Sequence, residues 1–272
     1  MGGASPTADA DLSERVALAV PAAHLRFWLT VVLGLGLDLW SKHWAFHTLR
    51  QGGARTLIPN VLEFHTTMNP GALFGFGAGR TGLFVIASLL ALALVLWMFA
   101  QCPARRWFTQ IALAAILAGA LGNMYDRVFV RLVPLAVGGA SGPPVLFCER
   151  VDSADGARIT LTEYPPTEAS FARELPSAAA AKLPPEAGYV RDFIKISQKW
   201  FGGRDVWPWV FNVADMLLVG GVGILAIRLL TDHRRAAAIT ARAAAATDEG
   251  DSAASRPATE TRANLDARAE ET

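Results

Sequence analysis

Four long apolar stretches constrain what this chain can fold into more than any other feature of its sequence. They lie at about residues 27–46, 81–100, 107–125 and 209–230, and each reaches the roughly 20 residues that a helix needs to cross about 30 Å of hydrocarbon. Lipid offers backbone groups no other hydrogen-bonding partner, so each stretch is expected to be helical. With 52% hydrophobic and 18% charged residues, the chain is too apolar for an ordinary soluble domain of 272 residues. The sequence predicts an all-α membrane protein with four transmembrane helices.

Basic residues near the ends of these stretches predict the orientation of the chain. The positive-inside rule places such residues in the cytoplasm, and they are Arg15, Arg26, Arg105, Arg106, Arg228, His233, Arg234 and Arg235. Both termini are then cytoplasmic, and two segments, about 47–80 and 126–208, face outward. The formal net charge of +1 offers no basic field for nucleic acid, so no nucleic-acid partner is expected.

The sequence predicts a division into three parts. Residues 1–24 form a cytoplasmic N-terminal segment, 25–230 a four-helix transmembrane domain, and 231–272 a cytoplasmic tail. The tail is rich in alanine and charged residues with almost no large apolar side chain, so it is expected to be disordered or weakly helical. In the second outward segment, strand-like runs on either side of residues 152–156 predict a β-hairpin.

Polar side chains occur where apolar stretches should carry none. Asp38 and Lys42 are four residues apart, so they share a helical face and neutralise each other. This spacing fits an ion pair that fixes helix packing, and it equally fits part of a functional site. At the end of the third stretch, Asn123 and Arg127 share a face and Asp126 lies one turn from Asn123. Small residues before them permit close helix approach, and together they predict a polar support network.

Two aspartates bracket the outer end of the last stretch. Asp192 precedes this stretch, and Asp215 lies about one turn inside it on the same face as Asn212. A carboxylate at that depth must be neutral, paired or beside water. Two neighbouring carboxylates can share one proton, so that one activates a water and the other donates a proton. The spacing suggests a catalytic pair, and a packing or transport role for Asp215 stays open at this point.

A glycine-rich turn at 69–77 carries a single amide side chain, that of Asn69. Its glycines, Gly71 among them, let the backbone approach a ligand closely, although a plain loop returning to the membrane has the same pattern. The chain has only five histidines and no phosphate-binding loop, so no metal and no cofactor are expected. Its two cysteines, Cys102 and Cys148, fall on opposite sides of the predicted membrane and are expected to stay unpaired.

Five segments, taken in chain order, resemble the signature blocks of the lipoprotein signal peptidase family, signal peptidase II. The blocks are Leu-Asp-Leu-Trp-Ser-Lys at 37–42, Asn-Pro-Gly-Ala-Leu-Phe-Gly at 69–75, Gly-Asn-Met-Tyr-Asp-Arg at 122–127, Gly-Tyr-Val-Arg-Asp-Phe at 188–193 and Phe-Asn-Val-Ala-Asp at 211–215. The resemblance is specific because all five occur in the expected order and at the expected places relative to the apolar stretches. It covers about residues 27–230, except for the interior of an insert at about 131–187.

The resemblance implies a multi-pass aspartic endopeptidase of the bacterial inner (plasma) membrane, independent of metal, with its active site on the periplasmic side. Its implied substrates are diacylglyceryl-modified prolipoproteins, from which it removes the signal peptide by cutting before the lipidated cysteine. The implied catalytic dyad is Asp192 and Asp215. The implied site-lining or supporting residues are Asp38, Lys42, Asn69, Gly71, Asn123, Asp126, Arg127 and Asn212. We also expect contact with membrane lipid, a small periplasmic β-rich cap over the pocket, and function as a monomer.

This chain departs from the family pattern at three places. Pro70 stands where a small polar residue is more usual. Arg191 replaces a commonly apolar neighbour of Asp192, and its charge would lower the pKa of that carboxyl if the two side chains faced each other. The insert at about 131–187 interrupts a link that is normally very short. It is interpreted either as a loop excursion tolerated at the surface, since loop closure costs grow slowly with length, or as a hairpin that rests on the cap and restricts which lipoproteins enter.

Two other functions compete with a peptidase. A small ion- or proton-coupled carrier could use the same carboxylates as a relay, but carriers more often have paired repeats or interrupted helices. Neither pattern occurs in this sequence, and the carboxylates gather on one side. A peptidase-like protein that binds lipidated peptides without cutting them is the other alternative, and the presence of both aspartates argues against it.

Overall fold

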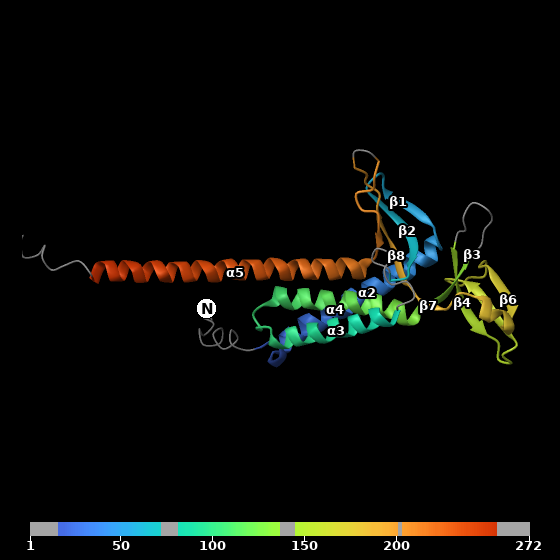
Figure 1. Ribbon diagram of the computed structural model, residues 1–272, viewed down its shortest axis with the longest axis horizontal. Helices are drawn as coiled ribbons and strands as arrows, with labels where there is room; N and C mark the ends of the chain where they lie inside the picture. The colour runs from blue at the N-terminus through green and yellow to red at the C-terminus, as the bar shows by residue number, and fades with distance from the viewer. Residues whose placement is uncertain (1–15, 72–80, 137–144, 201–202, 255–272) are drawn as a thin grey trace, which may run out of the picture. The chain divides into compact units, whose positions relative to one another are not determined.

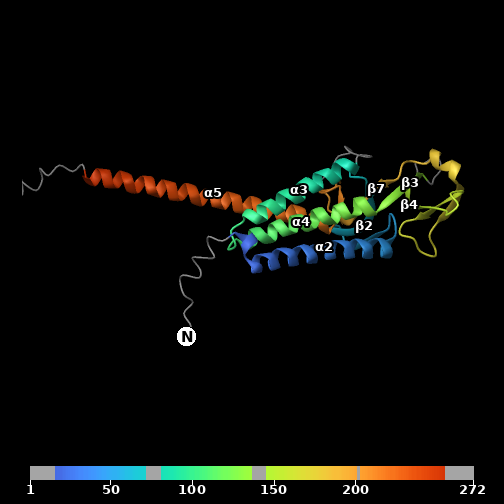
Figure 2. The same ribbon diagram turned by 90° about the horizontal axis from the view of Figure 1, so that it is seen from below.

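Three helices packed side by side form the body that carries the site (Figure 1). The computed structural model describes residues 16–71, 81–136, 145–200 and 203–254. In it, α4 (Trp107–Phe129) contacts both α2 (Pro21–Leu49) and α3 (Thr81–Gln101), as Figure 2 shows from below. A short 3-10 helix, η1 (Ala17–Ala19), leads into α2, and Pro21 is favourable in the first turn because its missing N–H needs no partner there. The last helix is α5 (Val213–Ala254).

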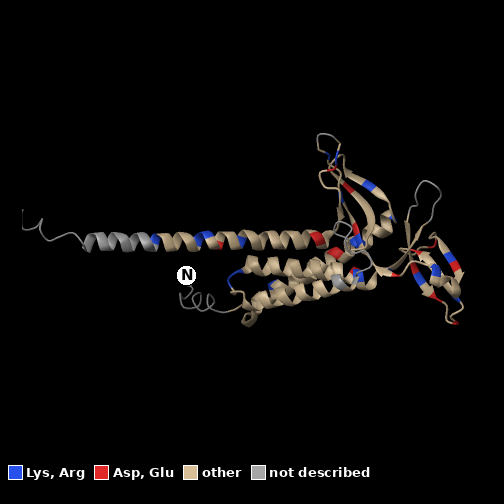
Figure 3. Ribbon diagram, in the orientation of Figure 1, with Lys and Arg blue, Asp and Glu red and all other residues tan. Residues whose placement is uncertain are grey.

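An apolar core joins the three helices. Phe27 and Val31 of α2 pack with Phe99 of α3 and with Leu113 and Leu117 of α4. Large apolar side chains are exposed on the outer faces of the helices, among them Leu29, Val32, Leu33, Leu37 and Trp40 on α2 and Val219 and Val222 on α5. Exposed apolar surface of this kind is typical of sites that contact a membrane or another protein. Charged residues are sparse along the three packed helices and gather where the helices meet the sheets (Figure 3).

The first sheet has four antiparallel strands in the order β1-β2-β8-β9. Their bounds are β1 Ala54–Ile58, β2 Leu62–Asn69, β8 Val190–Ile196 and β9 Val210–Phe211. This sheet brings residues far apart in the chain together, because Thr67 of β2 lies opposite Asp192 of β8. The cap that was expected in the first outward segment is therefore a sheet that is completed by the strand carrying Asp192.

The insert folds into a second antiparallel sheet with the order β6-β5-β4-β3-β7. Its strands are β3 Arg131–Ala136, β4 Val145–Asp152, β5 Arg158–Glu163, β6 Ala172–Pro176 and β7 Ala187–Gly188, with a 3-10 helix η2 (Ser177–Lys182) between the last two strands. The predicted hairpin is confirmed, because β4 and β5 pair directly around residues 153–157. Val133, Cys148 and Leu161 form the small core of this sheet.

The expected all-α class with four transmembrane helices is wrong. The described residues contain two antiparallel sheets, because the outward segments pair their strands with one another as well as locally. Within the same residues, three helical segments are long and apolar enough to cross a membrane, namely Pro21–Leu49, Trp107–Phe129 and Val213–Arg242. Within the part of the chain that the structure describes, α3 contributes the shorter apolar segment Val85–Gln101.

The chain separates into two compact units, Met1–Leu225 and Ala226–Thr272. The helical bundle and both sheets belong to the first unit. In the second unit, residues 226–254 are helical and continue α5. The expected division into 1–24, 25–230 and 231–272 stays a prediction.

Candidate active site

The residues 212–215 begin α5 with a capping box. Asn212 lies immediately before the helix, and its Oδ1 accepts a hydrogen bond from the backbone N–H of Asp215 at 3.1 Å. In return, Oδ2 of Asp215 accepts from the backbone N–H of Asn212 at 3.2 Å. Two amides that a first helical turn leaves without partners are thereby satisfied. The box also fixes the Asp215 carboxylate at the helix N-terminus, where the helix dipole favours negative charge.

Asp192 is held from two sides by neutral amides. The residue lies in β8 and is only 1% exposed. The side-chain amide of Asn212 donates to its Oδ1 at 2.6 Å, and that of Asn69 donates to its Oδ2 at 2.9 Å. Since Asn69 ends β2 and Asn212 begins α5, the carboxylate sits where the first sheet meets the helices.

Burial and a second carboxylate change the acidity of Asp192. Loss of solvation and, after it, the negative charge of Asp215 together raise the pKa of this carboxyl to about 7, against hydrogen bonds from Asn69 and Asn212 that favour the ionised form. A carboxyl group whose pKa lies near neutrality can be either protonated or ionised near pH 7. Asp192 can therefore act as a proton donor or as a proton acceptor.

Asn123 of α4 connects the two carboxylates to a buried cation. Its amide nitrogen donates to Oδ1 of Asp215 at 2.7 Å. Its Oδ1 accepts from Asn212 at 3.1 Å and from Nζ of Lys42 at 3.2 Å. Because each asparagine both donates and accepts, rotating one amide would break contacts at the other. The amides therefore fix the orientation of both aspartates.

The Asp38–Lys42 pair forms an ion pair and also contacts the site. Nζ of Lys42 lies 2.8 Å from Oδ2 of Asp38 and 3.3 Å from Oδ2 of Asp126, and all three residues are fully buried. The other oxygen of Asp38 accepts from the backbone N–H of Ala214 at 2.8 Å, in the first turn of α5. Lys42 thus balances one of the two carboxylates, Arg191 pairs with Asp126 to balance the other, and the cluster ties α2 to the helix end that carries Asp215.

Two further predicted residues, Arg127 and Gly71, donate hydrogen bonds to asparagines of the site. Nη1 of Arg127 donates to the backbone oxygen of Asn123 at 3.4 Å, and its charge acts on both Asp215 and Asp192. Gly71 adopts φ of 87°, a conformation that glycine takes without strain, and its N–H donates to Oδ1 of Asn69 at 2.9 Å. The rest of the glycine-rich turn, from residue 72 onward, lies outside the described residues.

Arg191 is the residue whose role the sequence reasoning missed. Arg191 was expected to lower the pKa of the Asp192 carboxyl if the two side chains faced each other, but the pKa of this carboxyl is raised by burial. Successive strand residues point to opposite faces, and Arg191 instead binds Asp126, with Nη2 at 2.6 Å from Oδ1. The period of two in the strand was the available signal.

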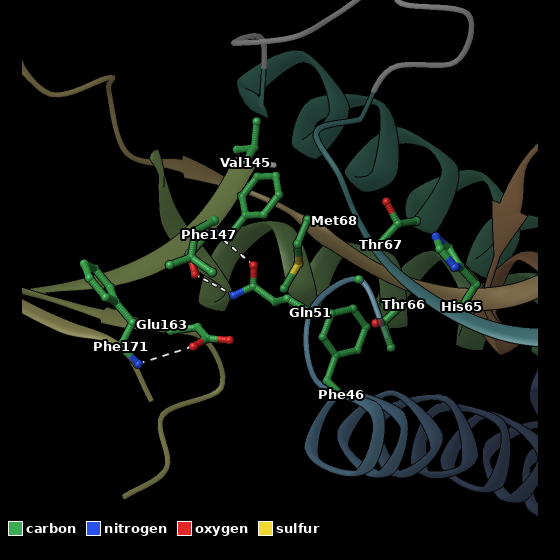
Figure 4. A pocket seen from close by; sticks show the side chains of 12 residues that line it. Phe46, Gln51, His65, Thr66, Thr67, Met68, Val145, Phe147, Glu163 and Phe171 are labelled. Carbon is green, nitrogen blue, oxygen red and sulfur yellow. Dashed lines mark hydrogen bonds between the residues drawn. The ribbon is translucent and has the colours of Figure 1, made fainter. Parts of the chain in front are cut away.

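A separate cavity of about 560 Å³ lies between the first sheet and the insert (Figure 4). Its wall includes Phe46 and Gln51 at the end of α2, Met68 of β2, Phe147 of β4 and Phe171. None of the predicted site residues lines it. Within the described ranges, no group of three His, Cys, Asp or Glu side chains has the arrangement to hold a metal ion.

Comparisons with known proteins agree on one family. A sequence profile of the family described as signal peptidase (SPase) II matches residues 30–231. A lipoprotein signal peptidase of Clostridium novyi (strain NT) is 36% identical over 105 residues, which cover 39% of this chain and 71% of the relative. One of Desulfitobacterium hafniense (strain DSM 10664 / DCB-2) is 24% identical over 208 residues, covering 76% of this chain and 95% of the relative. A solved structure described as a bacterial membrane enzyme is similar in fold, with a TM-score of 0.50 and 23% identity over 76% of this chain and 88% of that chain.

Proposed function

Because this chain belongs to the signal peptidase II family, we propose that it is an aspartic endopeptidase that removes signal peptides from diacylglyceryl-modified bacterial prolipoproteins, cutting before the lipidated cysteine. The observation that carries the proposal is that one residue, Asn212, donates hydrogen bonds to both aspartates. Asn212 donates to Asp192 through its side chain and to Asp215 through its backbone. Two carboxyl groups held by the same residue can provide the general base and the general acid that hydrolysis by an activated water requires.

The proposed reaction uses one shared proton. The ionised member of the pair takes a proton from a water, whose oxygen attacks the scissile carbonyl carbon while the protonated member donates to the carbonyl oxygen. Collapse of the tetrahedral intermediate then breaks the C–N bond. The proton held by the first carboxyl passes to the leaving amine, and one hydroxyl proton of the intermediate returns to the second carboxyl as the C=O bond re-forms. The raised pKa of Asp192, about 7, supports this exchange near neutral pH. The shared proton belongs to the coupled pair, so neither aspartate is assigned as its sole carrier.

The supporting residues have proposed roles that follow from their contacts. Asn69, Asn123 and Asn212 orient the two carboxylates so that water and peptide bond meet them without reorganisation. The Asp38, Lys42 and Asp126 cluster holds the N-terminal turn of α5 in place. The positive charge of Arg127 stabilises the ionised member of the pair, since it acts on both aspartates.

The position of the pair along the helices supports a substrate that comes from the membrane. Asp215 lies in the first turn of a helix that is long and apolar enough to span a bilayer, so the carboxylates lie near the depth at which a lipid-bearing cysteine would be held. Arg105 and Arg106 precede the opposite end of α4. By the positive-inside rule, the site then faces the periplasmic side of the bacterial inner membrane.

Cleavage of a diacylglyceryl-modified prolipoprotein by the purified protein in detergent tests the proposal, with a chelator present throughout. Wild type is expected to cut before the lipidated cysteine. Asp192→Asn and Asp215→Asn are expected to lose at least about 10³-fold in kcat while remaining folded. The matched control is Asp152→Asn, which removes an exposed carboxylate from the insert. If wild type fails to cut several such substrates, the peptidase proposal is wrong and proton transport in vesicles becomes the next measurement.

A further inference from the structure

Arg191 and Asp192 are neighbours that face opposite sides of β8. Asp192 meets the amides of Asn69 and Asn212, whereas Arg191, only 6% exposed, meets Asp126 of α4. The alternation of a strand requires this opposition. A rotation of β8 about its axis that moved one side chain would therefore move the other.

One carboxylate binds Arg191 through both its backbone and its side chain. The backbone N–H of Arg191 donates to Oδ2 of Asp126 at 2.9 Å, and Nε and Nη2 donate to Oδ1 at 3.1 and 2.6 Å. Such charge-assisted contacts are stronger and more directional than neutral ones. Rotation of β8 away from its present position would break all three. The contacts of Arg191 on one face of β8 consequently fix the orientation of the Asp192 side chain on the other face.

The backbone that enters β8 comes straight from the insert and packs tightly on α4. A Cβ at Gly188 would lie 1.9 Å from the backbone oxygen of Arg127, so only glycine fits this approach. The backbone N–H of Tyr189 donates to the oxygen of Val130 at 3.0 Å. The last strand of the insert and the strand that carries Asp192 are thus one continuous, closely packed segment.

The insert also reaches Arg191 from the side, through Tyr164. The hydroxyl of Tyr164 accepts a hydrogen bond from Nη1 of Arg191 at 3.2 Å. The backbone of Tyr164 is itself fixed, because its oxygen accepts from Nε2 of Gln51 at 2.5 Å, just after the end of α2. The same amide nitrogen donates to the oxygen of Phe147 at 2.6 Å. The backbone of Tyr164 is therefore held against the end of α2 by Gln51, while its hydroxyl contacts Arg191.

The charges around Arg191 explain why its guanidinium requires a neutral hydrogen-bond acceptor such as the Tyr164 hydroxyl. Asp126 is shared between Arg191 and Lys42, and Lys42 also serves Asp38. A buried guanidinium has five N–H donors to satisfy, and a donor left without a partner carries the full cost of its lost hydration. The Tyr164 hydroxyl gives Nη1 an acceptor without adding another charge.

We propose that Tyr164 and Arg191 form a positioning pair, through which the insert holds Asp192 in its orientation toward Asp215. The insert then serves the reaction directly, and the apolar residue that relatives commonly have before the first aspartate is replaced here by a cation that the insert stabilises. Neither residue is assigned contact with substrate. The kinetic consequence of the pair rests on the proposed function, whereas its effect on the rigidity of β8 does not.

The test compares Tyr164→Phe with wild type on the same lipidated substrate. The variant keeps the ring and removes only the hydroxyl, so kcat is expected to fall about 5- to 10-fold with KM within about 2-fold. Arg191→Lys keeps the charge and loses the planar fork, and the double variant is expected to lose no more than Arg191→Lys alone. The matched control is Tyr189→Phe, since the hydroxyl of Tyr189 makes no hydrogen bond within the described part of the chain.

Hydrogen–deuterium exchange of the purified protein in detergent provides the second measurement. Backbone amides of residues 190–196 are expected to exchange faster in Tyr164→Phe than in wild type or Tyr189→Phe, with exchange in β4 and β5 unchanged. Wild-type kcat and wild-type exchange in Tyr164→Phe would overturn the proposal. A lower Tm with both quantities unchanged would also overturn it, because the hydroxyl would then add stability only. If wild type itself does not cleave, the proposed function fails, and the exchange of residues 190–196 still decides whether the pair positions β8.

Discussion

Asn212 and Asp192, which lie in different elements, are joined by a 2.6 Å hydrogen bond from the Asn212 amide to the Asp192 carboxylate. The same asparagine caps α5 by accepting the N–H of Asp215. One side chain therefore sets the orientation of one aspartate and begins the helix that carries the other. Stability and activity are expected to depend on it together.

Asn212→Ala is predicted to lower both kcat and stability. The loss of the cap should cost about 1 kcal/mol, which corresponds to a fall in Tm of about 2–4 °C. The loss of the donor to Asp192 should lower kcat about 10-fold or more. Thermal unfolding and cleavage assays check the two effects, with Asn60→Gly as control because Asn60 lies in a turn at φ of 59° that glycine accepts. Wild-type kcat in Asn212→Ala would contradict the orienting role.

Lys42→Met is predicted to destabilise the protein strongly. It would leave Asp38 buried without its cation and Asp126 with Arg191 as its remaining charged partner, and breaking a buried ion pair costs about 3–5 kcal/mol. Adding Asp38→Asn to the variant should recover part of the loss, since the uncompensated charge is then removed. Denaturant unfolding in detergent measures this, and the exposed Lys182→Met serves as control, expected within about 0.5 kcal/mol of wild type. Equal stabilities for the two lysine variants would show that the cluster is not needed for folding.

Stability is predicted to fall between about pH 4 and about pH 7 because of Asp192. Its pKa is raised from 3.8 to about 7 by burial and by Asp215, so the folded state binds a proton that the unfolded state has released. That contribution is fully present below the ordinary pKa and is lost as pH rises through the folded value. The Tm of wild type should decline over this range, and the decline should be smaller in Asp192→Asn but not in Asp152→Asn. Parallel curves for wild type and Asp192→Asn would contradict the assigned shift.

Cys148 is predicted to resist thiol reagents in the folded protein. It is fully buried in the core of the insert, and burial, with the charge of Glu163, raises its pKa to about 11. Because the thiolate is the reactive form, alkylation followed by mass spectrometry should modify Cys148 only after unfolding. A cysteine introduced by Ser153→Cys, in the exposed turn of the hairpin, should react in the native state. Equal native rates at the two positions would show that the insert does not form its core.

Local spacing along the sequence indicated which neighbouring side chains of the candidate site share a helical face. Asp38 and Lys42 are four residues apart on a helix, and Asn212 and Asp215 have the spacing of a cap, so their contacts follow from helix geometry alone. The hairpin around residues 153–157 is local in the same sense. The apolar stretches predicted the helices of a membrane protein, although among the described residues three helices, and not the expected four, are long and apolar enough to span a membrane.

Only the tertiary structure decided which distant residues meet. The pairing of Thr67 with Asp192, the bond from Ala214 to Asp38, and the bond from Arg191 to Tyr164 join segments whose distance in sequence carries no signal. The fold class was missed for the same reason, because β2 and β8 become one sheet only when the insert and the helices bring them together. The sequence by itself determined the chemical groups and their local faces, and folding determined their partners, since burial forces each charge to find whichever neutralising group the packed elements place beside it.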